Sequence, residues 1–428
     1  MRHLYEHQRQ VLEDDLEKVG LFLGTGSGKT TIACLLSRKT TLILMPKTQY
    51  EDRNWFRELE LLGGGPQRYE SKYLPTDVKE MTFDIFKRDH EKLERCDTLV
   101  VDEAHGMLGV TPNTRQKNRQ PIPKASQRYE ALLAYVLRVK PSRIYLCSAT
   151  IAKSPFTVWA AGVILGKRPG DIQDFYQFRF EFYTRLPMPG REVWAPKNDS
   201  ATKDKLAALV REYGYTGRLE DFFDVPDQTF RTDHIELSQK QKDRIKKLTL
   251  EYPEPIVRVG KRHQVENGVL IGNEFAESET FPSEKIDKIL EYAAEFPRMV
   301  VFAKYTAQID AISTAVAKAG YNVLQMTGET KNRGEVIAEA NRREKNVFVV
   351  QAQISAGWEL PEYPVMIFAS RTYSFVDYDQ ALGRIQRANN IKKNLYINLV
   401  VKGGTDEAVD KALRNKSDFN ERIYAETV

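Results

Sequence analysis

The sequence has few cysteines and no long apolar run. Its three cysteines lie far apart, at Cys34, Cys96 and Cys147. This spacing fits neither a disulfide framework nor a zinc site, and it is typical of free thiols in an intracellular protein. No apolar stretch approaches the roughly 18 residues that a membrane span requires, and the N-terminal residues lack the apolar core of a secretory signal. We therefore expect no membrane association and a cytoplasmic location.

The sequence also has only a small excess of positive charge and no evident internal repeat. The 428 residues include 64 Lys and Arg against 59 Asp and Glu, which gives a net charge of +5. Such a small excess favours a polyanionic partner only weakly. No repeat with a period of roughly 20–50 residues indicates a solenoid. The length and the hydrophobic content of 41% predict roughly two or three packed domains in a soluble chain.

The strongest positive signal is a glycine-rich turn between a strand and a helix. Residues 19–23 form an apolar run, and residues 30–36 are typical of a helix. In such a loop, backbone N–H groups surround a polyphosphate, a lysine reaches its terminal phosphates and a hydroxyl binds Mg²⁺. Leu23 stands where this pattern usually has its first glycine. The predicted nucleotide-binding residues are Gly24, Thr25, Gly26, Ser27, Gly28, Lys29 and Thr30.

A pair of adjacent carboxylates follows another predicted strand. Asp102 and Glu103 come directly after the apolar residues 98–101. We expect Asp102 to hold Mg²⁺ together with Thr30, because carboxylate and hydroxyl oxygens suit this ion. Glu103 is suited to orient and deprotonate an attacking water.

Strands and helices alternate in both halves of the chain, which predicts α/β domains with parallel sheets. Further short apolar runs at 41–45 and 143–147 complete the first set of strands. A second set is predicted at 299–302, 322–326, 347–350, 365–369 and 395–400. In such sheets, ligands bind at the carboxyl ends of the strands. We expect a first domain at 1–152 and a second at 230–428.

The segment between these domains has a different texture. Residues 175–183 are dense in aromatics, and prolines follow at 187, 189 and 196. We predict an inserted, largely helical subregion and linker at 153–229. Packing inside a small helical lobe is the favoured interpretation of the aromatic run, and stacking on nucleic-acid bases is the alternative.

Together, these motifs resemble superfamily 2 helicases and translocases. Besides the phosphate loop and the Asp-Glu-Ala-His box at 102–105, Ser148-Ala149-Thr150 and the segment 380–387 are similar to family motifs. The resemblance implies two RecA-like domains, ATP and Mg²⁺ as cofactors, and Lys29 and Glu103 as catalytic residues. It also implies that Arg384 and Arg387, three apart on one helical face, are catalytic arginine fingers. Gln8 would bind adenine, and Gly357 would lie in a nucleotide-coupling motif.

Within the superfamily, the Swi/Snf-like branch resembles the chain best, in a compact form similar to phage helicases. For a phage protein, the location would be the host cytoplasm. The resemblance implies that Lys47, Thr82 and Thr327 contact nucleic acid. Residues 104–129 contain no acid after the box and include three prolines, which predicts a loop. Its Arg115, Lys117 and Arg119 either contact a phosphate backbone or form a solvated basic loop.

The function implied is an ATP-dependent DNA helicase or translocase that remodels forks or branched junctions. Single-stranded, duplex or branched DNA would be its partner, and nothing in the sequence requires an oligomer. Three alternatives remain: a duplex translocase that does not separate strands, an RNA helicase, and a nucleic-acid binding protein with a vestigial ATPase. No wedge or hairpin for strand separation is evident from the sequence.

Overall fold

The computed structural model describes residues 4–51, 53–63, 77–186, 193–272, 277–354, 358–386 and 393–414. The chain forms two compact units, Met1–Phe223 and Asp224–Val428. Within the described ranges, no helix combines the length and apolar character needed to cross a membrane.

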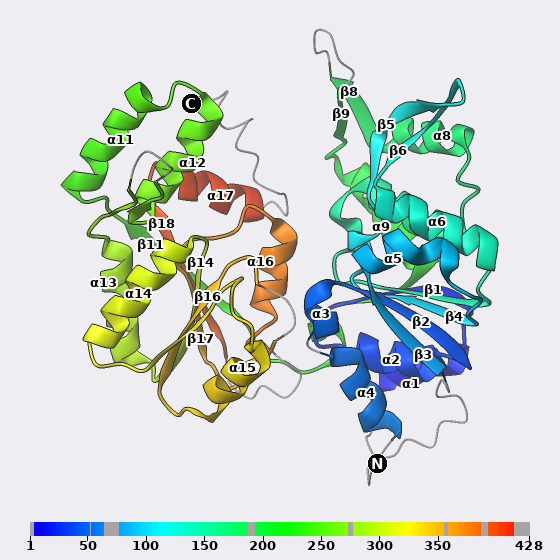
Figure 1. The fold of residues 1–428 in the computed structure, drawn as a ribbon, viewed down its shortest axis with the longest axis horizontal. Coiled ribbons are helices and arrows are strands. Elements are labelled where there is room, and N and C mark those ends of the chain that lie inside the picture. The colour runs from blue at the N-terminus through cyan, green and yellow to red at the C-terminus, as the bar shows by residue number, and fades with distance from the viewer. Residues whose placement is uncertain are drawn as a thin grey trace. The chain divides into compact units, whose positions relative to one another are not determined.

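The first unit is built on a six-stranded parallel sheet with the strand order β10-β1-β7-β4-β2-β3 (Figure 1). Four of its strands were predicted from apolar runs. The edge strands β3 and β10 were not predicted. The strands are β1 (Lys18–Leu23), β2 (Thr40–Met45), β3 (Asp77–Thr82), β4 (Thr98–Val101), β7 (Arg143–Cys147) and β10 (Gly214–Gly217).

Helices cover both faces of this sheet, and the strand residues alternate between two apolar cores. Leu42 and Leu44 of β2 point into one core, which α5, α6, α7 and α8 close. Ile43 and Met45 point into the other, which α1, α2 and α4 close. The helices are α1 (Glu6–Asp14), α2 (Lys29–Leu36), α3 (Lys47–Glu51), α4 (Asn54–Gly63), α5 (Phe83–Asp89), α6 (Gln127–Val139), α7 (Pro155–Ile164), α8 (Ile172–Phe182), α9 (Ser200–Tyr213) and α10 (Leu219–Phe222), with 3-10 turns η2 (His90–Lys92), η3 (Ala104–Gly106) and η4 (Ile151–Lys153).

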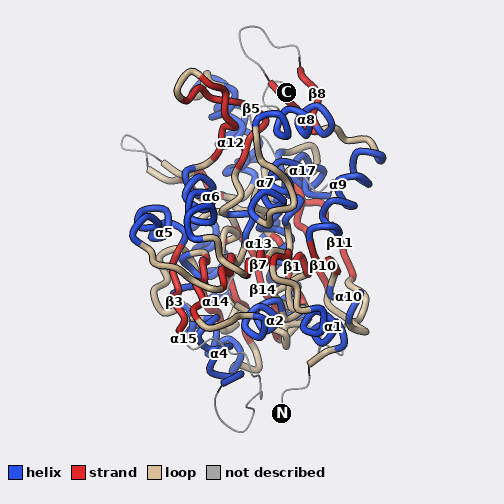
Figure 2. The backbone as a smooth tube through the Cα atoms, turned by 90° about the vertical axis from the view of Figure 1, so that its right-hand side faces the viewer, coloured by secondary structure: helices blue, strands red, loops and turns tan. Residues whose placement is uncertain are grey.

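Two β-hairpins extend from the first unit, and one of them corrects a prediction. Residues 104–129 are not a loop, because β5 (Val110–Lys117) and β6 (Gln120–Ala125) pair antiparallel. Asn118 and Arg119 at its tip have φ of 50° and 64°, which is the left-handed pair of a two-residue hairpin turn. The other hairpin joins β8 (Tyr183–Leu186) to β9 (Val193–Pro196). Figure 2 shows β5 and β8 near α8 at one end of this unit.

Most of the segment 153–229, up to Phe223, belongs to the first unit. Helices α7 to α10 make up most of it, but its strand β10 pairs with β1 and extends the first sheet. Phe175, Phe178 and Phe182 of the aromatic run are buried in the core, as the favoured interpretation predicted, whereas Phe180 is 60% exposed. The boundary between the compact units lies at Phe223 and Asp224.

The second unit repeats the parallel architecture with the order β11-β18-β17-β14-β16-β15. The predicted fold class, two parallel-sheet α/β domains, is confirmed. The strands are β11 (Thr229–Ile235), β14 (Arg298–Ala303), β15 (Val323–Met326), β16 (Asn346–Gln351), β17 (Val365–Phe368) and β18 (Leu395–Val401), beside the short pair β12 (Val269–Leu270) and β13 (Glu279–Thr280). The helices are α11 (Gln239–Glu251), α12 (Pro255–Glu266), α13 (Glu284–Glu295), α14 (Thr306–Lys318), α15 (Arg333–Arg342), α16 (Phe375–Leu382) and α17 (Thr405–Arg414).

A buried polar cluster ties three helices of the second unit together. The Lys285 ammonium on α13 donates to Asp406 Oδ2 on α17 and to Asn267 Oδ1, each at 2.6 Å. His263 on α12 lies 2.9 Å from Asp406 Oδ1 through its Nε2. Burial alone would raise the pKa of Asp406, but the Lys285 charge and the His263 contact outweigh it and lower that pKa. The cluster therefore holds a charged carboxylate inside the unit.

Candidate functional site

The predicted nucleotide-binding motifs of the first unit come together at one edge of its sheet. Strands β1, β7 and β4 are parallel neighbours, so their carboxyl ends share that edge. The phosphate loop follows β1, Ser148-Ala149-Thr150 follows β7, and Asp102-Glu103 follows β4. Three motifs that are far apart in the sequence thus meet where parallel α/β sheets bind ligands.

The phosphate loop has the backbone conformation that its glycines predict. Gly26 and Gly28 have φ of 83° and 81°, in the left-handed region that glycine adopts without strain. Lys29 opens α2, and its ammonium donates to the carbonyls of Leu23 (2.8 Å) and Gly24 (2.9 Å). The lysine therefore lies within the loop, beside the N–H groups of the helix start.

The departure from the usual pattern at Leu23 has a structural explanation. Leu23 is the last residue of β1, and its side chain is buried in the core beside α2. The backbone of the next residue packs closely against β10, because the Gly24 N–H donates to Gly217 O at 2.8 Å. A Cβ at Gly24 would lie 3.1 Å from the backbone nitrogen of Leu219. A side chain at position 24 would therefore press against the backbone at Arg218 and Leu219, whereas position 23 accepts an apolar side chain.

Asp102 is a buried carboxylate with two fixed hydrogen bonds. Its Oδ2 accepts from Trp55 Nε1 at 2.8 Å, and its Oδ1 accepts from the Glu103 N–H at 2.9 Å. Burial, followed by repulsion from Glu103, raises its pKa to about 6, against the lowering effects of Trp55 and Lys29. Because the charged form of this carboxylate is poorly solvated, a nearby cation stabilises it.

Glu103 and His105 connect the acidic box to the motif after β7. Glu103 has φ of 47°, and its carboxylate lies 3.4 Å from His105 Nδ1. The same His105 nitrogen lies 3.1 Å from Ser148 Oγ and 3.3 Å from Thr150 Oγ1. This short polar chain links the predicted general base to Ser148-Ala149-Thr150 within one unit.

Gln8 lies against the phosphate loop. It is buried on α1, its Oε1 accepts from the Tyr5 N–H at 3.1 Å, and its Nε2 would lie 2.1 Å from a Cβ at Gly28. The absence of a side chain at Gly28 therefore lets the Gln8 side chain and the loop approach each other. This geometry places Gln8 at the site without testing its predicted contact with adenine.

Sequence reasoning missed an aromatic cluster beside this glutamine. The His7 ring stacks on Phe222 with centroids 4.1 Å apart, and Tyr5 meets Phe223 edge-on at 4.5 Å. His7 Nε2 also lies 2.9 Å from Ser27 O in the loop. Phe222 and Phe223 lie more than 200 residues from Tyr5 in the sequence, so no local pattern joins them.

The described residues fit ATP and Mg²⁺. The left-handed glycines leave the loop amides open to a polyphosphate, and Lys29 supplies the cation. The Thr30 hydroxyl makes no hydrogen bond to the described part of the chain, and Asp102 offers a carboxylate near the Lys29 charge. An N–H cradle, a hydroxyl and a poorly solvated carboxylate form the donor set that a Mg²⁺-bound triphosphate requires.

The predicted arginine motif of the second unit differs from the expected helix. Helix α16 ends at Leu382, so Arg384 lies in the following turn and not on a helical face. Its side chain is buried, and it donates to Trp358 O at 2.9 Å and to Gln380 O at 3.0 Å. Arg387 and Gly357 lie outside the described residues. The catalytic role of the two arginines stays a prediction.

The predicted nucleic-acid residues lie in different settings. Lys47, at the start of α3, is 77% exposed and lies 3.5 Å from Glu51. Thr82 is buried, and its hydroxyl caps α5 by accepting from the Ile85 N–H. Thr327 follows β15, and its N–H donates to Thr330 Oγ1 at 2.9 Å.

The basic residues of the β5/β6 hairpin differ from one another. Arg115 is paired with Glu130 at 2.5 Å, whereas Lys117 and Arg119 are exposed at the tip. Lys117 and Arg119 at the tip, and Lys124 on β6, are exposed cations that form no ion pair with a described residue.

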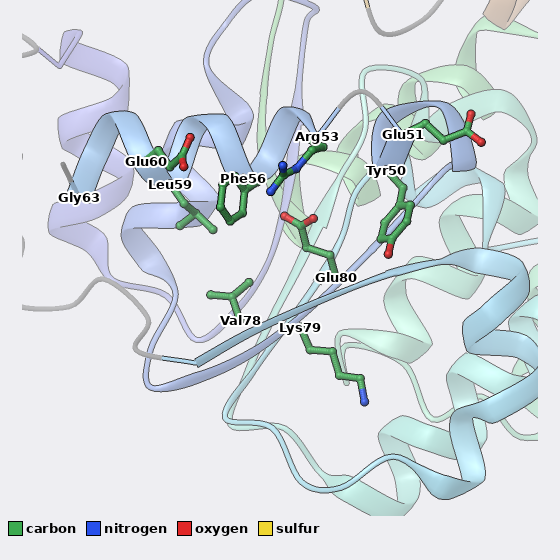
Figure 3. Close-up of a pocket in the computed structure, with 10 residues that line it drawn as sticks. All are labelled: Tyr50, Glu51, Arg53, Phe56, Leu59, Glu60, Gly63, Val78, Lys79 and Glu80. Carbon is green, nitrogen blue, oxygen red and sulfur yellow. The ribbon is translucent and has the colours of Figure 1, made fainter. Parts of the chain in front are cut away.

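A cavity of ≈ 910 Å³ lies elsewhere on the first unit, between α4 and β3 (Figure 3). The Arg53 guanidinium lies over the Phe56 ring at its wall, 4.2 Å from the centroid, and burial raises the pKa of Glu80 below it. No described residue of the phosphate loop lines this cavity. Size alone does not identify the functional site here.

Comparisons with known proteins agree with the helicase motifs in the second unit. Residues 283–389 match the model of the helicase conserved C-terminal domain, a range that includes Arg384 and Arg387. Among solved structures, the chain is similar to the Sulfolobus solfataricus SWI2/SNF2 ATPase core in complex with dsDNA. That similarity has 17% identity and a TM-score of 0.39, over 100% of this chain and 93% of the other. No curated protein matches the chain. The domain match, with the phosphate loop, supports a nucleic-acid-dependent ATPase.

Proposed function

We propose that this chain is an ATP-dependent DNA helicase or translocase that remodels forks or branched junctions, in a compact, phage-type form. The observation that carries the proposal is the meeting of Lys29, Asp102 and Glu103 at one sheet edge, in a chain whose second unit matches a helicase domain. This arrangement provides phosphate binding, cation binding and a base for water.

Each residue has a distinct role in the proposed hydrolysis. The loop amides and Lys29 hold the β- and γ-phosphates, and Thr30 and Asp102 would hold Mg²⁺, which neutralises phosphate charge when bound. Glu103 orients a water and accepts its proton. His105 contacts Glu103, Ser148 and Thr150 and so connects the base to the segment after β7. Arg384 and Arg387 would stabilise charge on the transferring phosphoryl group, since a guanidinium fork matches phosphate oxygens.

The two hairpins bear on the choice between strand separation and duplex translocation. The sequence showed no candidate wedge, but β5/β6 and β8/β9 are both projecting elements of the first unit. Their presence favours an activity that separates or remodels strands over simple duplex tracking. The similar solved structure is described as a complex with dsDNA, which keeps duplex DNA among the substrates to compare.

A substrate panel tests the proposal. ATP turnover and strand products are measured with single-stranded DNA, blunt duplex DNA, a fork, a four-way junction and duplex RNA. Stimulation and strand products with the fork or junction are expected. Stimulation by blunt duplex DNA without strand products would favour a duplex translocase, and preference for RNA would favour an RNA helicase. Absence of turnover with every substrate would contradict the ATPase and favour a binding protein.

A further inference from the structure

A second surface of the first unit has the composition of a nucleic-acid site, although none of the helicase motifs lies on it. A cavity of ≈ 390 Å³ opens between the end of α8 and the β8/β9 hairpin. Its described walls carry no carboxylate. They carry three cations (Arg179, Arg185 and Lys197) and three aromatic rings (Phe180, Tyr183 and Trp194).

Arg179 lies at the centre of this surface and has unused donor capacity. It is only 7% exposed, its Nη1 donates to Pro112 O at 3.2 Å, and its guanidinium lies 4.2 Å from the Trp194 ring centroid. Its Nε and the Trp194 Nε1 are both buried, and neither has a hydrogen-bond partner among the described residues. Buried N–H groups without acceptors are rare in proteins, so these two mark hydrogen-bonding capacity that the described residues leave unused.

The rim of the cavity alternates cations with aromatic rings. Phe180 is 60% exposed and meets Trp194 edge-on, with centroids 5.6 Å apart. Arg185 lies opposite Trp194 in the β8/β9 register, is exposed, and forms no ion pair with the described chain. Lys197 is fixed in place by donating to the Phe180 carbonyl at 2.9 Å. An exposed ring beside fixed and free cations suits a ligand that has both flat faces and negative charge.

Two described acids close to this surface in the sequence, Glu181 and Asp199, are engaged by other groups. Glu181 pairs with Lys205 at 3.0 Å. Asp199 caps α9 by accepting from the N–H and the hydroxyl of Thr202, each at 2.8 Å. The three cations of the cavity therefore retain their charge toward a ligand.

The surface continues onto the other hairpin. Pro112, whose carbonyl accepts from Arg179, belongs to β5, so the cavity and the β5/β6 hairpin are directly joined. Lys117 and Arg119 extend the run of exposed cations to the tip of that hairpin. Figures 1 and 2 both show α8, β5 and β8 side by side.

We propose that this cavity binds a single-stranded segment of nucleic acid. A base stacks on Phe180, a phosphate pairs with Arg185, and an acceptor oxygen of the strand takes the N–H groups of Arg179 and Trp194. In duplex DNA the base faces are covered by neighbouring bases, so only an unpaired strand offers an open base face together with a phosphate. The inference rests on the proposed function in taking nucleic acid as the partner, and it adds a site outside the helicase motifs.

The test measures binding of a fluorescently labelled thymidine oligonucleotide by anisotropy, without nucleotide, to the full chain. Phe180→Ala is expected to weaken binding about tenfold, because base stacking on an aromatic ring is worth that much. Arg185→Ala is expected to reduce the slope of log K against log salt by about 0.7. Matched controls are Leu137→Ala, which removes another exposed apolar side chain of this unit, and Arg211→Ala, which removes another exposed cation.

An abasic oligonucleotide separates the two contacts. The loss caused by Phe180→Ala should disappear on the abasic strand, whereas the effect of Arg185→Ala should remain. Neither variant should change binding to a blunt duplex by more than about twofold. Variants that bind the oligonucleotide as tightly as the Leu137→Ala and Arg211→Ala controls would overturn the proposal, as would equal losses on blunt duplex. ATP turnover of the unaltered protein tests the proposed function independently, so the two can fail separately.

Discussion

Trp55 donates its indole N–H to Asp102 Oδ2 at 2.8 Å, although 47 residues separate the two in the sequence. Trp55 lies on α4, and its ring is buried in the core that α1, α2 and α4 close. Asp102 directly follows β4. The bond fixes one oxygen of the predicted Mg²⁺ ligand while Glu103 N–H fixes the other. The orientation of the carboxylate thus depends on a helix outside the acidic box.

Replacing this donor should weaken Mg²⁺ binding. Trp55→Phe keeps a buried ring but removes the N–H that lowers the pKa of Asp102, so protons compete better with the ion. Loss of a hydrogen bond that orients a metal ligand is expected to raise the half-saturating Mg²⁺ concentration for ATP hydrolysis about tenfold. Trp159→Phe is the matched control, because Trp159 donates to Asp174 at 2.7 Å in the same unit but away from the site. An equal Mg²⁺ requirement in the two variants would contradict this role.

Asp102→Asn should stabilise the first unit above neutral pH while abolishing hydrolysis. The pKa of Asp102 is about 6 in the folded chain, above the value of about 3.9 for an unfolded aspartate. Its neutral form therefore favours folding at low pH, and this contribution is lost as the pH rises through 6. Near pH 8, removing the buried charge should raise the free energy of unfolding by about 2–3 kcal/mol.

Urea unfolding of the first unit measures this effect at two pH values. The gain from Asp102→Asn should shrink to a few tenths of a kcal/mol near pH 4, where the folded carboxyl is neutral and the unfolded one is about half ionised. A gain that is the same at both pH values, or no gain near pH 8, would show that burial does not set this pKa.

Gly28→Ala should impair nucleotide binding more than backbone strain explains. Gly28 and Gly166 both have left-handed φ, of 81° and 70°. A Cβ at Gly28 would lie 2.1 Å from Gln8 Nε2, whereas a Cβ at Gly166 would have nothing within 4 Å. Both variants should lose about 1 kcal/mol of stability from the φ alone.

Steady-state ATP kinetics distinguish the two glycine variants. Only Gly28→Ala should raise the KM for ATP, by about tenfold or more, because the added methyl group forces the phosphate loop and Gln8 apart. Equal KM values would mean that the contact between Gln8 and the loop has no part in nucleotide binding.

Lys285→Met should destabilise the second unit strongly. Lys285 is 1% exposed and is the main cation that balances Asp406, so its loss leaves the buried carboxylate with only the His263 contact. The expected cost is about 3–5 kcal/mol in unfolding free energy. Lys288→Met on the same helix is the control, since its ion pair with Glu291 lies at the surface and contributes little. Similar unfolding curves for the two variants would contradict the cluster's role.

Much of the fold was predictable because buried parallel strands are continuous apolar runs. Residues 98–101 and 143–147 coincide with β4 and β7, and the phosphate loop and the acidic pair follow such strands. The two edge strands of the first sheet were missed for physical reasons. In β3, which lies at one edge, polar and apolar residues mix, and β10 is four residues with glycine at both ends. Its Gly214 is required by contact with the Gly20 carbonyl, which local sequence does not reveal.

The β5/β6 hairpin was missed because its prolines suggested a loop. A two-stranded ribbon has free edges, so Pro121 and Pro123 fit there without breaking a ladder. Its turn residues, Asn118 and Arg119, lack the glycine that usually signals such a turn. In the site, the Trp55 and His7 contacts escaped prediction because they join distant segments through packing, which no spacing rule encodes.

The most direct test of the central claim is DNA-stimulated ATP hydrolysis by Glu103→Gln, with Lys29→Ala measured beside it. Glu103→Gln keeps the size of the side chain and removes the base that accepts a proton from water. It should bind ATP as the unaltered chain does while its turnover falls at least about 100-fold. Lys29→Ala should lose ATP binding as well as turnover, since the loop loses its cation. DNA-stimulated turnover within a few-fold of the unaltered chain in either variant would contradict the account.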